Sequence, residues 1–210
     1  ELILSYDQDV APGTDAAPAS ADQAAGRSRG FGYWLPAILV LGLILGVAIG
    51  YLIPRGGTEA PGDTSPEAGF TRDMSTHHAQ AVEMGMIAYT RAANGDVRLM
   101  ARDIALTQQG QIGMFQAWLR EWNLNPTGSQ PPMAWMPDGA SSVRNGLMPG
   151  MATPEELVQL RTATGLAEDR LFLRLMIQHH LGGIHMAQDI EGRTEHEEVL
   201  EMAQLAIDNQ

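Results

Sequence analysis

The sequence predicts an all-α protein, a bundle of four helices that is made of a duplicated helical hairpin and preceded by a single transmembrane helix. Three observations support this prediction. A His-Met element occurs twice, 102 positions apart. Long segments around both copies have apolar residues at helical spacing. One uncharged segment near the N-terminus is long enough to cross a bilayer.

The composition restricts the chemistry that the chain can perform. Its 210 residues carry a net charge of −12, all thirteen basic residues are arginine, and there is no cysteine. The absence of cysteine excludes disulfides and thiolate ligands. Nucleic-acid partners are not expected either, because they select proteins with a basic face.

Residues 1–32 are rich in Ala, Pro, Asp, Ser and Gly and poor in large apolar side chains. A segment of this composition cannot bury enough apolar surface to offset the entropy of folding. We therefore expect a disordered tail.

Residues 33–53 form the predicted transmembrane helix. After Trp34, nineteen uncharged and largely aliphatic residues continue to Ile53. As a helix they span about 28 Å, which matches a hydrocarbon core of about 30 Å. Tyr33, Trp34 and Tyr51 lie where interfacial aromatic residues are expected. The partner predicted for this segment is the lipid bilayer of the cell membrane.

The flanking charges predict the orientation of this span. Arg27 and Arg29 precede it, whereas acidic residues dominate the segment that follows. The positive-inside bias therefore places the N-terminal tail in the cytoplasm and the rest of the chain outside. Residues 54–68 are rich in Gly, Pro and Glu and form a predicted linker. Residues 69–210 form the predicted extracytoplasmic bundle.

A stripe of small residues lies within the predicted span. Gly42, Gly46 and Gly50 recur every four residues, a spacing that lets another helix approach closely. The stripe and the N-terminal tail are candidate docking elements for a larger membrane complex. The ordinary glycine content of membrane helices would also account for the stripe.

The first helix of the bundle is expected from about Pro66 to Ala93. It should stop at Asn94-Gly95 in a left-handed cap, after which Asp96 should cap the second helix. The second helix should continue to about Trp122. Its apolar spacing predicts a core-facing stripe of Met100, Ile104, Gln111, Met114, Phe115, Trp118 and Trp122.

Residues 123–152 form a long, proline-rich connection that carries four methionines. Two of them frame Met148-Pro149-Gly150-Met151, a predicted tight turn that would present two thioethers near each other. Methionine in a loop more often fills a hydrophobic gap, so this turn is of interest only together with the His-Met elements.

Two capping boxes are expected in the second half of the chain. Thr153 with Glu156 should open a short third helix that begins at Pro154. A fourth helix should follow from about Leu166 to Glu191. Thr194 and Glu197 should open the fifth. His185 and His196 lie away from the His-Met stripe and are expected at the surface.

The internal repeat pairs residues 70–108 with residues 172–210. The alignment has no gaps and contains eleven identities over thirty-nine positions, among them Arg72 with Arg174 and Gln108 with Gln210. Such a register indicates a duplicated helical unit. Since Gln210 corresponds to a position well inside the second helix, the fifth helix should either be shorter than its copy or continue further.

Helical geometry places the His-Met residues of each copy on one face. At about 100° per residue, Met74, His77, His78 and Met84 fall within one arc, and Met176, His179, His180 and Met186 repeat it. If the two copies pack face to face, four imidazoles and up to four thioethers converge on the bundle interior, where helical bundles build metal sites. The two elements are therefore treated as halves of one site.

The same residue types also occur in helical bundles that bind no metal. A histidine on an apolar face is usually a core residue with hydrogen-bonded nitrogens, and a methionine at helical spacing usually packs. A di-iron oxidase would need inward glutamates and Glu-x-x-His pairs, which neither His-His helix contains. No Ser-His-Asp set, phosphate loop or catalytic carboxylate pair stands out, so no enzyme is predicted.

The sequence resembles the bacterial domain-of-unknown-function 305 family over about residues 69–210. The resemblance rests on Phe70-x-x-x-Met74-x-x-His77-His78-x-x-Ala81-x-x-Met84, Trp118-Leu119, Met148-Pro149-Gly150-Met151-x-Thr153-x-x-Glu156, Phe172-Leu173-x-x-Met176-Ile177-x-His179-His180 and Met186-Ala187. It implies a ferritin-like four-helix bundle outside the cytoplasm and copper binding by His and Met. The ligands that it implies are His77, His78, Met84, His179, His180 and Met186, with Met74, Met176, Met148 and Met151 as further candidates. The chain departs from the family pattern at Gln178 and at Leu181-Gly182-Gly183.

Ligand chemistry independently favours copper as the bound ion. Thioethers are soft ligands that suit Cu(I), and imidazole binds copper in either oxidation state, whereas zinc would be expected to recruit Cys or carboxylate. The sequence therefore predicts an extracytoplasmic copper-binding protein for sequestration, tolerance or delivery of the ion, with Cu(I) as the favoured state. The alternative is a non-catalytic accessory subunit that docks on a respiratory or transport complex.

Overall fold

The computed structural model describes residues 60–210. Within these residues the chain is helical, without named strands, which confirms the predicted all-α class. None of the helices described is both long and apolar enough to cross a membrane. The predicted tail at residues 1–32, the transmembrane span at 33–53 and residues 54–59 of the predicted linker lie outside the described residues.

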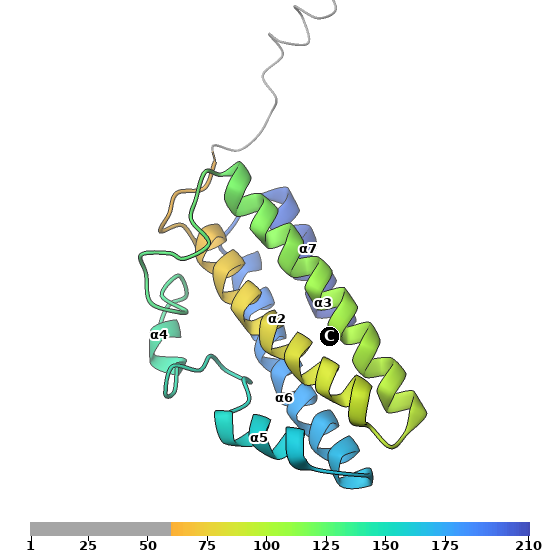
Figure 1. The fold of residues 1–210 in the computed structure, drawn as a ribbon. Helices are drawn as coiled ribbons and strands as arrows, with labels where there is room; N and C mark the ends of the chain where they lie inside the picture. Colours follow the sequence, from red (N-terminus) through yellow and green to blue (C-terminus); the bar gives the residue numbers. More distant parts are fainter. Residues whose placement is uncertain (1–59) are drawn as a thin grey trace, which may run out of the picture. The chain divides into compact units, whose positions relative to one another are not determined.

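Two long hairpins form the bundle (Figure 1). The first consists of α2 (Pro66–Arg91) and α3 (Gly95–Glu121), and the second of α6 (Leu166–Glu191) and α7 (Glu197–Asn209). The connection between them contains the short helices α4 (Gly139–Ser142) and α5 (Pro154–Thr162). The expected duplication of a helical hairpin is therefore visible in the fold, with a second copy whose last helix is about half as long as its counterpart α3.

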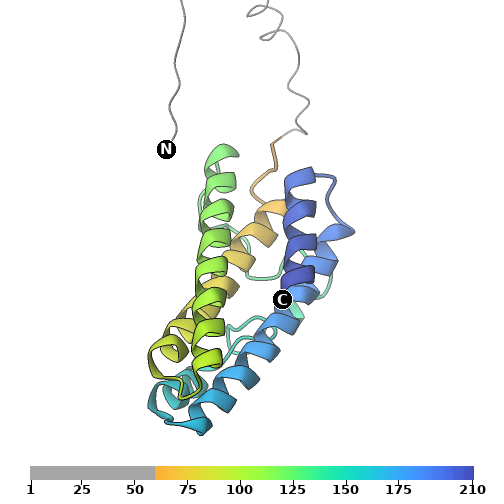
Figure 2. The ribbon, with the colours of Figure 1, turned by 90° about the vertical axis from the view of Figure 1, so that its right-hand side faces the viewer.

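The central pair of the bundle is α2 with α6. Helix α2 packs against α3 and against α6, and α6 packs in turn against α7. Figure 2 shows α3 and α7 on opposite flanks of the molecule. Because α2 and α6 carry the two copies of the His-Met element, this arrangement places both copies in the interior.

The turn between α2 and α3 differs from the prediction. Ala92, in an extended conformation, ends α2, and Asn94 is the N-cap of α3, where its side chain accepts a hydrogen bond from the backbone of Asp96. Neither Asn94 nor Gly95 has a positive φ. The predicted left-handed cap is thus wrong, and Asn94 takes the capping role expected of Asp96, because α3 already begins at Gly95 and Asn94 is the residue that precedes it.

The predicted stripe of α3 is buried only in part. Gln111, Phe115 and Trp118 lie in the core, whereas Met100 and Met114 are 49% and 47% exposed. Met114 lines an open groove of about 400 Å³ between α3 and α7, so no helix of residues 60–210 covers its side of the stripe. Ile104 is half-buried and Trp122 is buried.

Capping in the second half follows the prediction at one helix and not at another. Thr153 and Glu156 form the expected reciprocal capping box of α5. The box expected from Thr194 and Glu197 is absent: Thr194 Oγ1 accepts from the backbone of His196, which is the N-cap of α7. His196 is also not a surface residue, because its ring packs against Trp122 at 5.4 Å between centroids. His185 is exposed, as predicted.

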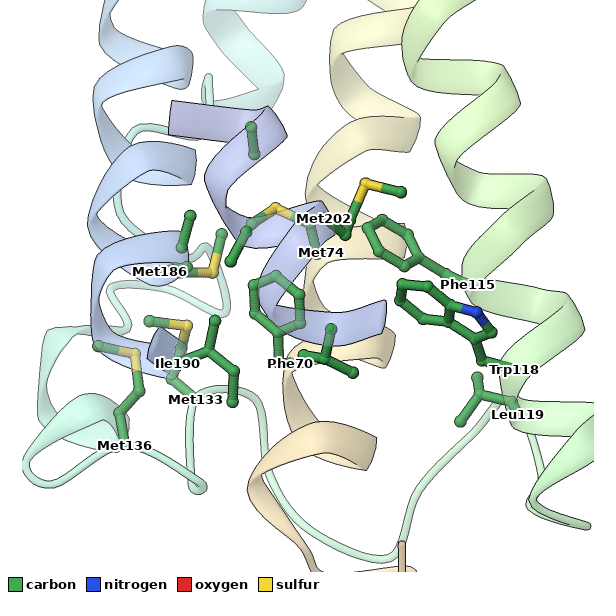
Figure 3. Packing of buried hydrophobic residues seen from close by; sticks show 14 of the residues in the cluster. Phe70, Met74, Phe115, Trp118, Leu119, Met133, Met136, Met186, Ile190 and Met202 are labelled. Carbon is green, nitrogen blue, oxygen red and sulfur yellow. The ribbon is translucent and has the colours of Figure 1, made fainter. Parts of the chain in front are cut away.

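The buried residues divide into two hydrophobic clusters along the α2/α6 pair. One lies toward the start of α2 and the end of α6 (Figure 3) and the other toward the end of α2 and the start of α6. Four buried methionines from outside the His-Met elements contribute to the first cluster, namely Met133, Met136, Met148 and Met202. The paired histidines lie between the two clusters along both helices.

Candidate metal centre

The imidazoles of His77 and His179 are in direct contact where α2 meets α6. Their ring centroids are 3.7 Å apart with an interplanar angle of 33°, and both side chains are fully buried. The two residues occupy the same position of the repeat. The structure thus brings together the two halves of the predicted site at this pair.

Backbone carbonyls fix the protonation of both rings. His77 Nε2 lies 3.1 Å from the carbonyl oxygen of Pro149, and His179 Nε2 lies 2.9 Å from the carbonyl oxygen of His77. A carbonyl can only accept, so each ring donates from Nε2. In the neutral imidazole the lone pair is then on Nδ1.

His78 is held in the same tautomer by a side chain of α3. Its Nε2 lies 2.8 Å from Gln111 Oε1, and its ring contacts the edge of Phe115 at 5.7 Å between centroids. The amide oxygen accepts the Nε2 hydrogen. His78 therefore also has its lone pair on Nδ1.

These three Nδ1 atoms have no hydrogen-bond partner. The Nδ1 atoms of His77, His78 and His179 are all buried from solvent and unpaired. An unsatisfied buried acceptor costs about 1 to 3 kcal/mol, and ordinary core histidines are satisfied at both nitrogens. The three imidazoles are thus in the neutral form whose unpaired nitrogen can coordinate a metal ion.

The fourth histidine differs from the other three. His180 is only half-buried, and its Nε2 lies 3.1 Å from Gln108 Nε2. An amide nitrogen can only donate, so the ring accepts at Nε2 and carries its hydrogen on Nδ1. His180 is thus the opposite tautomer.

Burial keeps the whole set neutral. It lowers the pKa of His77 to about 4, that of His78 to about 3 and that of His179 to about 2, with the neighbouring histidines adding to the shift. Burial also lowers the pKa of His180. None of the rings therefore has to release a proton before binding a metal near neutral pH.

The methionines of the two elements are divided between the ends of the site. Met74 and Met186 lie in the first hydrophobic cluster with Met148, as Figure 3 shows for the first two. Met84 and Met176 lie in the second cluster. Since α2 and α6 run in opposite directions, the proximal methionine of one copy is grouped with the distal methionine of the other. The four thioethers flank the imidazoles in pairs rather than meeting at one point.

The predicted turn at Met148-Pro149-Gly150-Met151 is present and packs onto both helices. Met151 N donates to Met148 O at 3.1 Å, and Gly150 has φ +82°. Met148 is buried and Met151 is half-buried against the first cluster. The turn lies against α6 so closely that a Cβ at Gly182 would be 2.0 Å from the Pro149 oxygen. The missing side chain at Gly182 therefore makes room for the turn.

Sequence reasoning missed three glutamines that organise the site. Gln80 binds the backbone of Ala152 through both ends of its amide, at 2.7 and 2.9 Å, while Gln108 and Gln111 contact the second histidine of each copy. Gln108 had one signal in the sequence, because it is an identity in the repeat. Gln111 had its place in the predicted core-facing stripe, without a signal for its contact to His78, and Gln80 had none.

The described side chains do not already surround a metal-sized position. Within residues 60–210, no group of three or more His, Cys, Asp or Glu side chains is placed to hold a metal ion. The imidazoles alone therefore do not form a closed cage in this conformation. A metal centre here requires thioether ligands or a movement of at least one ring.

Comparison with known families and structures gives consistent matches over the helical part of the chain. The family described as Domain of unknown function (DUF305) matches residues 67–210. A comparison with curated proteins gave no match.

Three solved structures illustrate the similarity. A DUF305 protein from Streptomyces coelicolor, described as a candidate secreted protein, is 41% identical, with a TM-score of 0.63 over 70% of this chain and 86% of its own. A DUF305 fragment from Deinococcus radiodurans is 30% identical, with a TM-score of 0.55 over 68% and 86%. CopM in its Cu(II)-bound form is 26% identical, with a TM-score of 0.52 over 69% and 86%, and a Cu(I)-bound form of CopM matches equally well.

Proposed function

Because the chain belongs to the DUF305 family, we propose that it is a membrane-anchored extracytoplasmic protein that binds copper for sequestration, tolerance or delivery. The observation that carries this proposal is the set of three buried, neutral imidazoles with unpaired Nδ1 atoms. Copper is the cargo of the site in this proposal. No catalytic role is proposed.

Two lines of support favour copper over other ions. CopM, which shares this fold and 26% of its residues in the aligned part, has solved Cu(II)-bound and Cu(I)-bound forms. The donor types available in the bundle are imidazole and thioether, which bind Cu(I) well and offer little to magnesium or calcium. We propose Cu(I) as the preferred state, because thioethers are soft ligands.

The proposed ligands start from the central pair. His77 and His179 would supply Nδ1 donors to one ion or to two neighbouring ions, with His78 and His180 on either side. The methionine pairs at both ends would supply thioethers. The full proposed set is His77, His78, Met84, His179, His180, Met186, Met74, Met176, Met148 and Met151.

The location outside the cytoplasm is supported by sequence and by similarity. Residues 33–53 have the length and apolar character of a membrane span, with arginines on the N-terminal side. The Streptomyces coelicolor relative is described as a candidate secreted protein. We propose that the helical part works outside the membrane, where methionine ligands persist under oxidising conditions that consume thiols.

Copper content of purified protein tests the proposal. The wild-type chain and the double variant His77→Ala/His179→Ala would be loaded with Cu(I) under reducing conditions, and bound metal would be quantified after gel filtration. We expect stoichiometric copper in wild type and at least a tenfold loss in the double variant. The exposed His185→Ala is the matched control and should bind like wild type. Wild-type protein without copper, or a double variant with full copper, would refute the proposal.

A further inference from the structure

Two glutamines of α3 contact the second histidine of each copy with opposite polarity. Gln108 and Gln111 are one helical turn apart, and they are 3% and 6% exposed. Gln111 presents its oxygen to His78, whereas Gln108 presents its nitrogen to His180. The same side chain thus performs two different tasks within one site.

The task of Gln111 is to support coordination. Its oxygen accepts the Nε2 hydrogen of His78 and so leaves the lone pair on Nδ1 without a partner. A second group that fixes the tautomer of a metal-binding histidine in this way also orients its ring. Gln111 is therefore a positioning residue.

The task of Gln108 is to occupy the lone pair on Nε2 of His180. Its amide N–H donates to His180 Nε2 at 3.1 Å, so the ring carries its hydrogen on Nδ1. While this hydrogen bond lasts, neither nitrogen of His180 can coordinate. The other end of the amide, Gln108 Oε1, is buried without a partner, so the side chain gains nothing from its oxygen in this position.

His180 is also the imidazole of the four that solvent reaches. His77, His78 and His179 are fully buried, whereas His180 is half-buried, and the neighbouring side chains Ile177 and Leu181 on α6 are 60% and 62% exposed. An ion that arrives from solvent meets this ring before the buried ones.

From this arrangement we propose that Gln108 is a gate on the metal centre and that His180 is the first ligand to capture copper. This inference rests on the copper-binding function proposed above. In the capture step the N–H···N hydrogen bond from Gln108 to His180 breaks and a bond from Nε2 to the ion forms. No proton is released, because Nε2 already lacks one. The buried Nδ1 donors then receive the ion from His180.

The comparison of Gln108→Leu with Gln111→Leu tests the gate. The 210-residue chain would be mixed with the Cu(I) acetonitrile complex in a stopped-flow instrument, and the final affinity would be measured by competition with bathocuproine disulfonate. Gln108→Leu should load about fivefold faster, the factor for one neutral hydrogen bond. Gln111→Leu should lower the affinity at least tenfold, the usual cost of losing such a supporting contact. The exposed Gln188→Leu is the control for adding leucine and should match wild type.

The tautomers can be read without any metal. Long-range nitrogen–proton NMR correlations of the metal-free chain should show Nε2–H on His77, His78 and His179 and Nδ1–H on His180. An Nε2–H signal on His180 would overturn the gate, because Gln108 would then be an acceptor.

The kinetic outcomes separate the two proposals. If wild type binds copper and Gln108→Leu loads at the wild-type rate, the gate is refuted and the copper function stands. If wild type binds no copper, the proposed function itself is refuted. If Gln108→Leu is the only variant that binds copper faster than wild type, and the tautomers are as expected, both the copper-binding function and the gate are supported.

Discussion

The two copies of the repeat meet the same loop in different ways. On α2 the first copy has Gln80, whose amide binds Ala152 N and O. At the equivalent position on α6 the second copy has Gly182, whose missing side chain admits the Pro149 carbonyl. One copy holds the loop by hydrogen bonds and the other by leaving space for it.

A second contrast concerns the outer histidines. His78 in the first copy is fully buried and supported by Gln111, whereas His180 in the second is half-buried and capped by Gln108. The first copy is sealed and the second is open to solvent. A duplicated sequence therefore yields a site with two unlike sides.

The single connection between the hairpins explains the asymmetry. Only one loop links α3 to α6, and its turn at residues 148–151 can lie on just one side of the central pair. That loop accepts a hydrogen bond from His77 through Pro149, whereas His179 donates to the backbone of His77 instead. Residues of the two copies thus experience different surroundings from the same sequence register.

Acidification should have the largest effect on this arrangement. The folded pKa values of His77, His78 and His179, at about 4, 3 and 2, lie below the ordinary value of 6.5. The unfolded state then binds more protons, so stability is complete above about pH 6.5 and falls as the pH drops toward the folded values. With about 1.4 kcal/mol per pKa unit, the loss should reach several kcal/mol by about pH 4.

Urea unfolding followed by circular dichroism between about pH 7.5 and pH 4 would measure this loss for the metal-free protein. An NMR titration of the same sample would sharpen the comparison of the two copies, since half-exposed His180 should protonate at a higher pH than buried His78. A free energy of unfolding that stays constant from about pH 6.5 to pH 4.5 would contradict the burial of neutral imidazoles.

Gly182→Ala should be the most damaging single substitution on the open side. The added Cβ would lie 2.0 Å from the Pro149 oxygen, which is backbone and cannot swing away. Overpacking of this kind costs about 3 kcal/mol. Thermal and urea unfolding would report the loss.

Gly113→Ala provides the matched control within a long helix. A Cβ at Gly113 meets nothing within 4 Å, so the substitution should stabilise the protein by about 0.5 to 1 kcal/mol through helix propensity. If Gly182→Ala is as harmless as Gly113→Ala, the turn does not lie against α6 as described.

Gln80→Leu should have a smaller effect on the sealed side. It leaves Ala152 N and O buried without partners, at a cost of about 2 kcal/mol in the free energy of unfolding. The loop should also exchange its amide hydrogens faster at Ala152. Exposed Gln188→Leu is the control. Wild-type exchange at Ala152 in Gln80→Leu would mean that the side-chain contacts do not hold the loop.

Local signals in the sequence predicted the helices well. The bounds of α6 and the capping box of α5 follow from Gly165, Thr153, Pro154 and Glu156, each of which acts within one turn of its own position. The start of α2 at Pro66 follows for the same reason. These features need no knowledge of tertiary packing.

The errors occurred where packing decides the outcome. His196 is half-buried because Trp122 from another helix lies beside it, and Met114 is exposed because α7 leaves a groove there. Neither partner could be inferred from the spacing of apolar residues along a single helix.

The sequence predicted the histidines of the site but not the residues that hold them in position. The repeat register identified the four histidines, and the structure brings His77 and His179 into contact. The roles of Gln80 and Gln111 could not be predicted, because the role of a glutamine inside a helix depends on the group that packs against it. The need for glycine at position 182 could not be predicted either, because it arises from the Pro149 carbonyl of the loop.

The smallest predicted effect contrasts the first turns of the two central helices. In the second copy Asp169 accepts hydrogen bonds from the backbone of Ala93 and Asn94, and adjacent Glu168 is fully buried with neither oxygen paired. Burial, and then the neighbouring Asp169, raise the pKa of Glu168 to about 7. In the first copy the equivalent turn contains half-exposed Glu67.

Glu168→Gln should therefore stabilise the protein at about pH 8 and not at about pH 4. A raised folded pKa means that the folded state binds the extra proton, so this contribution is present below about pH 4.5 and is lost as the pH rises through about 7. Removing the charge should recover on the order of 1 kcal/mol at about pH 8, measured by urea unfolding at both pH values. Glu67→Gln should change stability by less than about 0.5 kcal/mol at either pH. If Glu168→Gln and Glu67→Gln change the free energy of unfolding equally, the first turns of α2 and α6 are electrostatically alike. The two copies would then differ only in their contacts with the loop.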